Sequence, residues 1–264
     1  MDFIKNIFSK PDDKIKVGIS LSGGGVRGIA HLGVLKALNE NDIFPEIVSG
    51  VSAGALVGVF YCDGYKPEEI LQIFRKTHFF NFARLTVPRT GFMTMYKVEK
   101  ILKEKIRAKK FKDLKIPLTV AASNLNDGII EYFSEGDLID KIIASASIPV
   151  LFKPRIINDK TYVDGGILDN LPVHPIRKKC DKLIASHVNP LSKENDLNSM
   201  LDIAERTFHL SIASSVQKNA KESDLFIEPE ELIKHSLLKM ENIDDIFSIG
   251  YESTKRILKK NTVF

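Results

Sequence analysis

The chain of 264 residues is 44% hydrophobic and 27% charged, which is ordinary for a globular protein and argues against disordered and fibrous classes. The formal net charge of +4 comes from basic residues spread along the chain without aromatic stacking partners, so we expect no nucleic-acid partner. Two cysteines without close spacing, Cys62 and Cys180, predict neither a metal site nor a disulfide framework.

Short apolar runs alternate with helical patterns in the first part of the chain. Residues 16–21 predict a buried strand, 22–28 a glycine-rich turn and 29–39 a helix. A strand at 46–49 and an apolar helix from Ser52 onward repeat this order. The order strand, helix, strand, helix predicts parallel strands joined by right-handed crossovers.

The remaining predicted elements complete one α/β domain with helices on both faces of its sheet. They are helices over 67–76, 98–108 and 137–146, strands over 118–123, 129–133, 161–163 and 182–188, and a mostly helical region from about residue 198. We expect a single domain over 1–264. Its motif-bearing core would span about 15–190 and its helical C-terminal part about 198–264.

The sequence predicts no membrane-spanning helix, because its longest uncharged apolar run, 54–62, is far shorter than the roughly 20 residues that a bilayer needs. The first residues are too interrupted for a signal peptide, so we expect a cytoplasmic location. Peripheral membrane contact stays open, because the apolar residues within 3–8 fall at helical spacing. The sequence does not predict an oligomeric state.

A Gly-x-Ser-x-Gly pattern, Gly50 to Gly54, lies between a predicted strand and a predicted helix. A sharp strand-to-helix turn favours glycines beside the serine, because neighbouring side chains would collide there. The turn exposes the oxygen of Ser52, and the helix N-terminus favours negative charge that develops next to it. Ser52 is therefore the candidate nucleophile of an acyl-ester hydrolase.

The glycine-rich turn offers consecutive N–H groups without side chains, which can bind the oxyanion of an acyl-transfer reaction. The same turn fits the dinucleotide fingerprint Gly-x-Gly-x-x-Gly through Gly23, Gly25 and Gly28. That alternative requires an acidic residue about 20 positions further on, at the end of the second strand. The second strand ends in Ser49-Gly50 instead, which weakens the alternative and leaves it open.

A serine nucleophile needs a base, and two types are available in this sequence. Asp164 follows a predicted strand and precedes Gly165-Gly166. His174 and His187 come after Asp164, so a triad in the order Ser, Asp, His is formally possible. Neither histidine lies in a glycine turn, and we expect His31 to be a helix-packing residue with one hydrogen-bonded nitrogen.

Three ordered motifs resemble those of the patatin-like phospholipases: Gly-Gly-Gly-x-Arg-Gly, then Gly-x-Ser-x-Gly, then Asp-Gly-Gly. The resemblance covers roughly 17–175. It includes the flanking matches Ala144–Pro149, Phe152, Pro154 and Asn170–Pro172.

This resemblance implies a three-layer α/β/α sandwich with a mostly parallel central sheet, and a substrate that is an acyl ester of a lipid. It implies a dyad of Ser52 as nucleophile and Asp164 as general base, with no histidine base, metal or cofactor. Arg27 would be structural or would organise the loop. The implied oxyanion-hole residues are Gly23, Gly24, Gly25, Val26, Arg27 and Gly28, and the motif turns are Gly50, Gly54, Gly165 and Gly166.

Two further expectations concern substrate access and the acyl acceptor. The segment 78–96, with the aromatic and methionine residues in and just before it, is expected to form a groove wall or mobile cover for lipid, with a simple core role as the alternative. An acyltransferase would use the same acyl-enzyme as a hydrolase, so the sequence leaves both open.

Overall fold

The computed structural model describes residues 15–77, 79, 95–191, 203, 206–207, 210, 215–237 and 242–260. Its strands are β1 Val17–Leu21, β2 Ile47–Val51, β3 Leu118–Asn124, β4 Ile129–Phe133, β5 Arg155–Ile157, β6 Lys160–Asp164, β7 Lys182–Ser186 and β8 Leu225–Ile227. Its α-helices are α1 Ala30–Asn39, α2 Ala53–Cys62, α3 Pro67–Thr77, α4 Tyr96–Lys105, α5 Leu138–Ser145, α6 His174–Arg177 and α8 Ile243–Lys260. The short 3₁₀ helices are η1 Gly25–Ile29, η3 Phe111–Asp113, η4 Gly165–Ile167 and η5 Glu230–Lys234.

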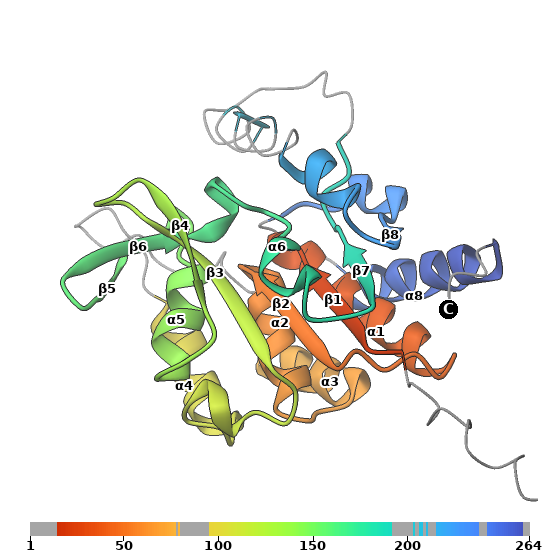
Figure 1. Ribbon diagram of the computed structural model, residues 1–264, viewed down its shortest axis with the longest axis horizontal. Coiled ribbons are helices and arrows are strands. Elements are labelled where there is room, and N and C mark those ends of the chain that lie inside the picture. Colours follow the sequence, from red (N-terminus) through yellow and green to blue (C-terminus); the bar gives the residue numbers. More distant parts are fainter. Residues whose placement is uncertain are drawn as a thin grey trace, which may run out of the picture.

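The strands form one central sheet in the order β5-β6-β3-β2-β1-β7-β8, with β4 paired to the free edge of β3 (Figure 1). The strands from β3 through β2, β1 and β7 to β8 are parallel to one another. The pairs β3–β4, β3–β6 and β5–β6 are antiparallel. The predicted parallel sheet is therefore confirmed at its centre, and an antiparallel extension is added at one side.

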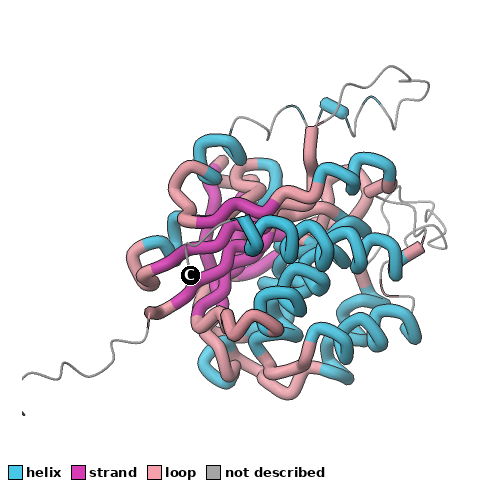
Figure 2. Tube along the Cα trace, turned by 90° about the vertical axis from the view of Figure 1, so that its right-hand side faces the viewer, coloured by secondary structure: helices cyan, strands magenta, loops and turns pink. Residues whose placement is uncertain are grey.

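Helices cover both faces of the sheet, and the two coverings differ in thickness (Figure 2). The main core packs α1, α2, α3 and α5 against one face. A smaller cluster lies on the other face, where Val173 and Ile176 at α6 pack with Leu183 of β7 and with Val216. The three-layer α/β/α sandwich expected from the sequence is confirmed.

The C-terminal helix α8 packs closely against α1, the helix that follows the glycine-rich turn. A Cβ atom placed on Gly250 of α8 would lie 2.1 Å from the carbonyl oxygen of Ala30. A Cβ atom placed on Gly33 of α1 would lie 2.1 Å from the carbonyl oxygen of Phe247. Glycine on both helices lets the two backbones touch, which fixes α8 against the motif-bearing part of the chain.

Strand registers place the ends of β2 and β6 side by side along one edge of β3. Val51 pairs with Ala121, and Asp164 pairs with Ala122, the next residue of β3. Strand β4 pairs with β3 across both of these positions and occupies one edge of β3. Strands β2 and β6 therefore both lie on the other edge of β3, where their ends meet. Ser52, the residue after β2, is thereby brought next to Asp164.

Two strands, β5 and β8, were not predicted from the sequence. Each has three residues, which is too short for a period of two to be recognised. Strand β2 also runs two residues beyond the predicted end, to Val51, so that Ser52 follows it directly. Among the described residues, no helix is long and apolar enough to cross a membrane.

Candidate active site

Ser52 lies in a strained turn between β2 and α2. Its backbone φ of 52° and ψ of −121° lie in a region that residues with a side chain seldom adopt, and the side chain is only 7% exposed. A Cβ atom on Gly54 would lie 2.2 Å from the carbonyl oxygen of Leu21, and one on Gly50 would lie 2.7 Å from the carbonyl oxygen of Gly54. The two glycines of the motif thus allow β1, β2 and α2 to meet around the serine.

Asp164 is buried at the end of β6, and its carboxyl group lies close enough to the Ser52 hydroxyl for that hydroxyl to lower its pKa. The N–H of Gly166 donates to Oδ1 of Asp164 at 2.8 Å. Burial nevertheless raises the pKa of Asp164 from 3.8 to about 6, against the opposing effects of the Ser52 hydroxyl and the Gly166 N–H. A Cβ atom on Gly165 would lie 2.4 Å from the carbonyl oxygen of Ala121, so this turn also needs glycine to reach β3.

The end of helix α5 holds both Ser52 and Asp164 by their backbones. The N–H of Ser52 donates to Oγ of Ser145 at 2.9 Å, and the N–H of Asp164 donates to the carbonyl oxygen of Ser147 at 2.9 Å. Both serines lie in the segment Ala144–Pro149 that resembles the family, and the sequence predicts no role for them. No local sequence signal marks them as anchors, because their partners lie far away in the chain.

The glycine-rich turn passes directly beside the serine. A Cβ atom on Gly23 would lie 3.2 Å from Cβ of Ser52. Within the described part of the chain, neither Gly24 nor Gly25 donates its N–H to an acceptor. The N–H of Val26 donates to the carbonyl oxygen of Leu237 at 2.8 Å, and that of Arg27 to Gly24 at 3.1 Å. The six residues expected to form an oxyanion hole therefore differ in the availability of their donors.

Arg27 connects the turn to the C-terminal part of the chain. Its buried guanidinium donates from Nε to the carbonyl oxygen of His235 at 2.7 Å and from Nη2 to that of Ile233 at 3.5 Å. Gly25, at φ 53°, approaches the carbonyl oxygen of Leu237 so closely that a Cβ atom would lie 2.2 Å away. The C-terminal segment thus fixes the glycine-rich turn. The sequence motifs did not indicate this contact between the two segments.

Four of the six histidines lie among the described residues, and each of them contacts a polar group other than the Ser52 side chain. His31 is bonded through both ring nitrogens, to Oγ of Ser186 at 2.8 Å and to the carbonyl oxygen of Ser22 at 2.9 Å. The expectation of one bonded nitrogen is therefore wrong, because the buried ring lies between two strand ends. Burial also lowers the pKa of His31 to about 4, so the ring is neutral.

The two histidines proposed as alternative bases contact carboxylates elsewhere. Nδ1 of His174 lies 3.0 Å from Glu222, and Nδ1 of His187 lies 2.7 Å from Glu228. The fourth described histidine, His235, lies 3.1 Å from Asp245. Asp164 is thus the titratable side chain that the strand registers bring next to Ser52.

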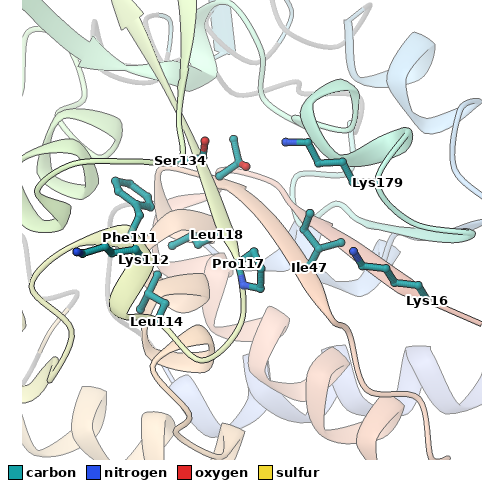
Figure 3. Close-up of a pocket in the computed structure, with 10 residues that line it drawn as sticks. Lys16, Ile47, Phe111, Lys112, Leu114, Pro117, Leu118, Ser134 and Lys179 are labelled. Atoms are coloured by element: carbon teal, nitrogen blue, oxygen red, sulfur yellow. The ribbon is translucent and has the colours of Figure 1, made fainter. Parts of the chain in front are cut away.

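A separate pocket of about 620 Å³ lies at the opposite end of the parallel strands. Its lining includes Ile47 and Leu118, the first residues of β2 and β3, whereas Ser52 follows the last residue of β2. Figure 3 shows Lys16 and Lys179 beside Ile47 at this pocket. The pocket is thus distinct from the Ser52 site.

In the described ranges, no three His, Cys, Asp or Glu side chains gather as metal ligands would.

Most of the segment expected to act as a groove wall or cover, 78–96, lies outside the described residues. Phe74, Phe79 and Met95 are described at its borders, and all three are buried in the main core. Phe74 and Phe79 stack with ring centroids 4.5 Å apart. These residues therefore have the core role that was the alternative, and a cover function for the rest of the segment stays a prediction.

Comparisons with known proteins agree on one family. The profile of the family described as patatin-like phospholipase matches residues 19–177. Lysophospholipase NTE1 of Meyerozyma guilliermondii is 27% identical to this chain, over 89% of the chain and 19% of its own length. Lysophospholipase NTE1 of Kluyveromyces lactis is 25% identical, over 95% of the chain and 20% of its own length. The chain thus spans about a fifth of the length of these relatives.

A solved structure has the same fold. VipD from Legionella pneumophila superimposes with a TM-score of 0.58 at 17% sequence identity, over 93% of this chain and 67% of that chain. At this identity the likeness concerns the arrangement of helices and strands.

Proposed function

Because the chain belongs to the patatin-like phospholipase family, we propose that it hydrolyses acyl esters of lipids through a catalytic dyad of Ser52 and Asp164. The observation that carries the proposal is the close approach of the Ser52 hydroxyl, at the N-terminus of α2, to the buried Asp164 carboxylate at the end of β6. A serine held in a strained turn, beside a carboxylate and next to a glycine-rich turn, provides the nucleophile, the base and the anion site of acyl transfer.

The reaction proceeds in two steps. Asp164 accepts the hydroxyl proton of Ser52 while the serine oxygen attacks the ester carbonyl, and the carbonyl oxygen becomes an oxyanion. The N–H groups of Gly24 and Gly25 donate to that oxyanion, and the positive end of the α2 dipole stabilises it further. The alcohol then leaves with the proton from Asp164. Water, deprotonated by Asp164, attacks the acyl-serine. The carboxylic acid is released as the ester bond to Ser52 breaks, and Asp164 returns the proton to the serine oxygen.

The raised pKa of Asp164 suits this role. A carboxylate with an ordinary pKa near 3.8 is a weak base toward a hydroxyl, whereas a pKa of about 6 leaves the group deprotonated at neutral pH and makes it more basic. Burial of the carboxylate in this site causes that rise. The described histidines have partners elsewhere, which supports a dyad over a triad.

The proposed substrate class is a lipid with an ester-linked acyl chain, such as a lysophospholipid or a phospholipid. The names of the similar proteins of Meyerozyma guilliermondii and Kluyveromyces lactis support the lysophospholipid. The acyl-enzyme would also serve transfer to an alcohol or thiol. Product analysis with and without such an acceptor separates hydrolysis from transfer.

A fluorophosphonate probe, read out by intact mass, tests the nucleophile and its base. Wild type is expected to gain one adduct, Ser52→Ala none, and Asp164→Asn an adduct at a rate reduced by about 10³-fold or more. Ser134→Ala, at the distant pocket, is the matched control and should label like wild type. Labelling of Ser52→Ala at the wild-type rate would disprove the proposal.

Histidine substitutions test the dyad separately. His174→Ala and His187→Ala are expected to hydrolyse a p-nitrophenyl ester within a few-fold of the wild-type rate. A loss of about 10³-fold in either variant would instead indicate a triad.

A further inference from the structure

The Gly23–Gly24 peptide is fixed in direction by two side chains that bind its carbonyl group. The carbonyl oxygen of Gly23 accepts a hydrogen bond from Nδ2 of Asn189 at 2.8 Å and one from Oγ of Ser22 at 3.0 Å. Because a trans peptide is planar, its N–H points opposite to its carbonyl group. The hydrogen bond from Asn189 therefore also sets the direction of the Gly24 N–H.

The contacts of the two glycines show which side of the turn faces the nucleophile. A Cβ atom on Gly23 would lie 2.4 Å from Oδ1 of Asn170 and 3.2 Å from Cβ of Ser52. A Cβ atom on Gly24 would instead lie 2.4 Å from Cγ2 of Val188 and 3.0 Å from Oδ1 of Asn189. The turn thus runs between Ser52 and Asn170 on one flank and Val188–Asn189 on the other. With the Gly23 carbonyl group bound on the Asn189 flank, the Gly24 N–H is directed toward the Ser52 flank.

Pairing between β1 and β7 brings Asn189 to this position. Leu21 pairs with Ser186 at the ends of the two strands, and the N–H of Ser22 donates to the carbonyl oxygen of Ser186 at 3.0 Å. The N–H of Val188 then donates to Oγ of Ser22 at 3.1 Å. The segment that follows β7 is therefore fastened along the glycine-rich turn.

Asn189 keeps this position although one of its polar atoms is not satisfied. Its side chain is 8% exposed, and its Oδ1 is buried without a hydrogen-bond partner in the described structure. A buried acceptor left unpaired is unfavourable, because it has lost its hydrogen bonds to water without replacement. The fold tolerates this cost at a residue whose amide N–H binds the turn beside the nucleophile. Asn189 also lies outside residues 19–177, which match the family profile.

We propose that Asn189 is a positioning residue, which orients the Gly24 N–H toward the oxyanion by holding the carbonyl group of Gly23. The inference rests on the proposed function, in which Gly24 is an oxyanion donor. Losing an oxyanion donor outright lowers kcat by about 10²–10³-fold. Asn189→Ala frees the peptide and leaves the donor in place, so we expect a smaller loss of about 10–100-fold in kcat, with KM nearly unchanged.

The test uses the full chain and two variants, Asn189→Ala and the nearly isosteric Asn189→Asp, which removes the donated N–H. Asn124→Ala is the matched control, because Asn124 is also buried and its Nδ2 donates to Asp127 and Glu131, away from the glycine-rich turn. Thermal unfolding shows which variants are folded, and kcat and KM are compared for those that are.

A substrate-like trifluoromethyl ketone gives a readout that a purely structural role would not move. Its adduct with Ser52 carries the oxyanion, so its Ki should rise in the Asn189 variants by the same factor by which kcat/KM falls. Asn124→Ala should change neither quantity by more than about threefold. Wild-type kcat and Ki in a folded Asn189→Asp variant would overturn the inference.

The fluorophosphonate experiment separates this failure from failure of the proposed function. If wild type labels at Ser52 and the Asn189 variants label equally fast, only the role of Asn189 is wrong. If wild type does not label at Ser52, the proposed function fails and the role of Asn189 fails with it.

Discussion

Replacing Asp164 by asparagine should stabilise the protein at neutral pH while it abolishes efficient catalysis. The carboxylate is buried, and burial raises its pKa from 3.8 to about 6. Each pKa unit corresponds to about 1.36 kcal/mol, so the ionised carboxylate destabilises the folded state by about 3 kcal/mol at pH 8. Asparagine removes the charge and can still accept the hydrogen bond from the N–H of Gly166.

The pH dependence of this effect follows from the direction of the pKa change. A carboxyl group with a raised pKa in the folded state binds its proton more tightly there than in the unfolded chain. Wild type therefore loses stability relative to Asp164→Asn as the pH rises from about 3.8 through about 6, and the difference is constant above that range. Well below pH 3.8, where both states are protonated, the difference from ionisation disappears.

Urea unfolding of wild type and Asp164→Asn at several pH values between 4 and 8 measures this difference directly. Other titrating groups are common to both proteins and cancel. Ser52→Ala serves as control, because it keeps the carboxylate and should not show the stabilisation of about 3 kcal/mol. A difference in unfolding free energy that does not grow between pH 4 and pH 7 would refute the reasoning.

Three further predictions concern activity and packing. The kcat/KM for a p-nitrophenyl ester should fall with unit slope below an apparent pKa of about 6, because protonated Asp164 cannot act as base; a profile without an inflection between about pH 5 and 7 would contradict this. Ser145→Ala should slow fluorophosphonate labelling and lower the unfolding free energy by about 1–3 kcal/mol, because the buried N–H of Ser52 loses its acceptor; unchanged labelling would count against it. Gly250→Ala should lower the unfolding free energy by about 1–3 kcal/mol, because the added methyl group meets the backbone of α1. Gly58→Ala is its control, since the new Cβ would lie 3.3 Å from a side-chain methyl group of Leu118; equal thermal midpoints for the two variants would contradict the packing argument.

The elements that position the Ser52 site were predicted well, because their patterns are local. The strand before the glycine-rich turn, the helix after it and the strand-to-helix turn at Ser52 each have a signature within about ten neighbouring residues. Strands β5 and β8 escaped prediction, because three residues carry no recognisable period and their stability comes from pairing with β6 and β7. The antiparallel direction of the strands on one side of the sheet also could not be predicted, because it depends on which strands pair and not on the sequence pattern of each strand.

The sequence predicted the candidate nucleophile and base of the site and did not indicate the residues that hold their surroundings. Ser52 stands out in the sequence because the sharp strand-to-helix turn requires glycine on both sides of it, at Gly50 and Gly54. Ser145 and Asn189 are ordinary polar residues in sequence, and they act on partners 93 and 166 residues away in the chain. A pattern read along the chain does not contain such contacts.

By itself, the sequence predicted the candidate nucleophile and base, and it determined the order of strands and helices that carries them. Local backbone geometry accounts for this, since a strained turn, a glycine-rich turn and a short apolar strand are each specified by adjacent residues. The tertiary structure decided the rest. The register of β2 and β6 on β3 brought Ser52 to Asp164, burial raised the pKa of that carboxylate, and contacts with Leu237 and Asn189 fixed the glycine-rich turn. These properties depend on solvent exclusion and on pairing between distant segments, which exist only once the chain has folded.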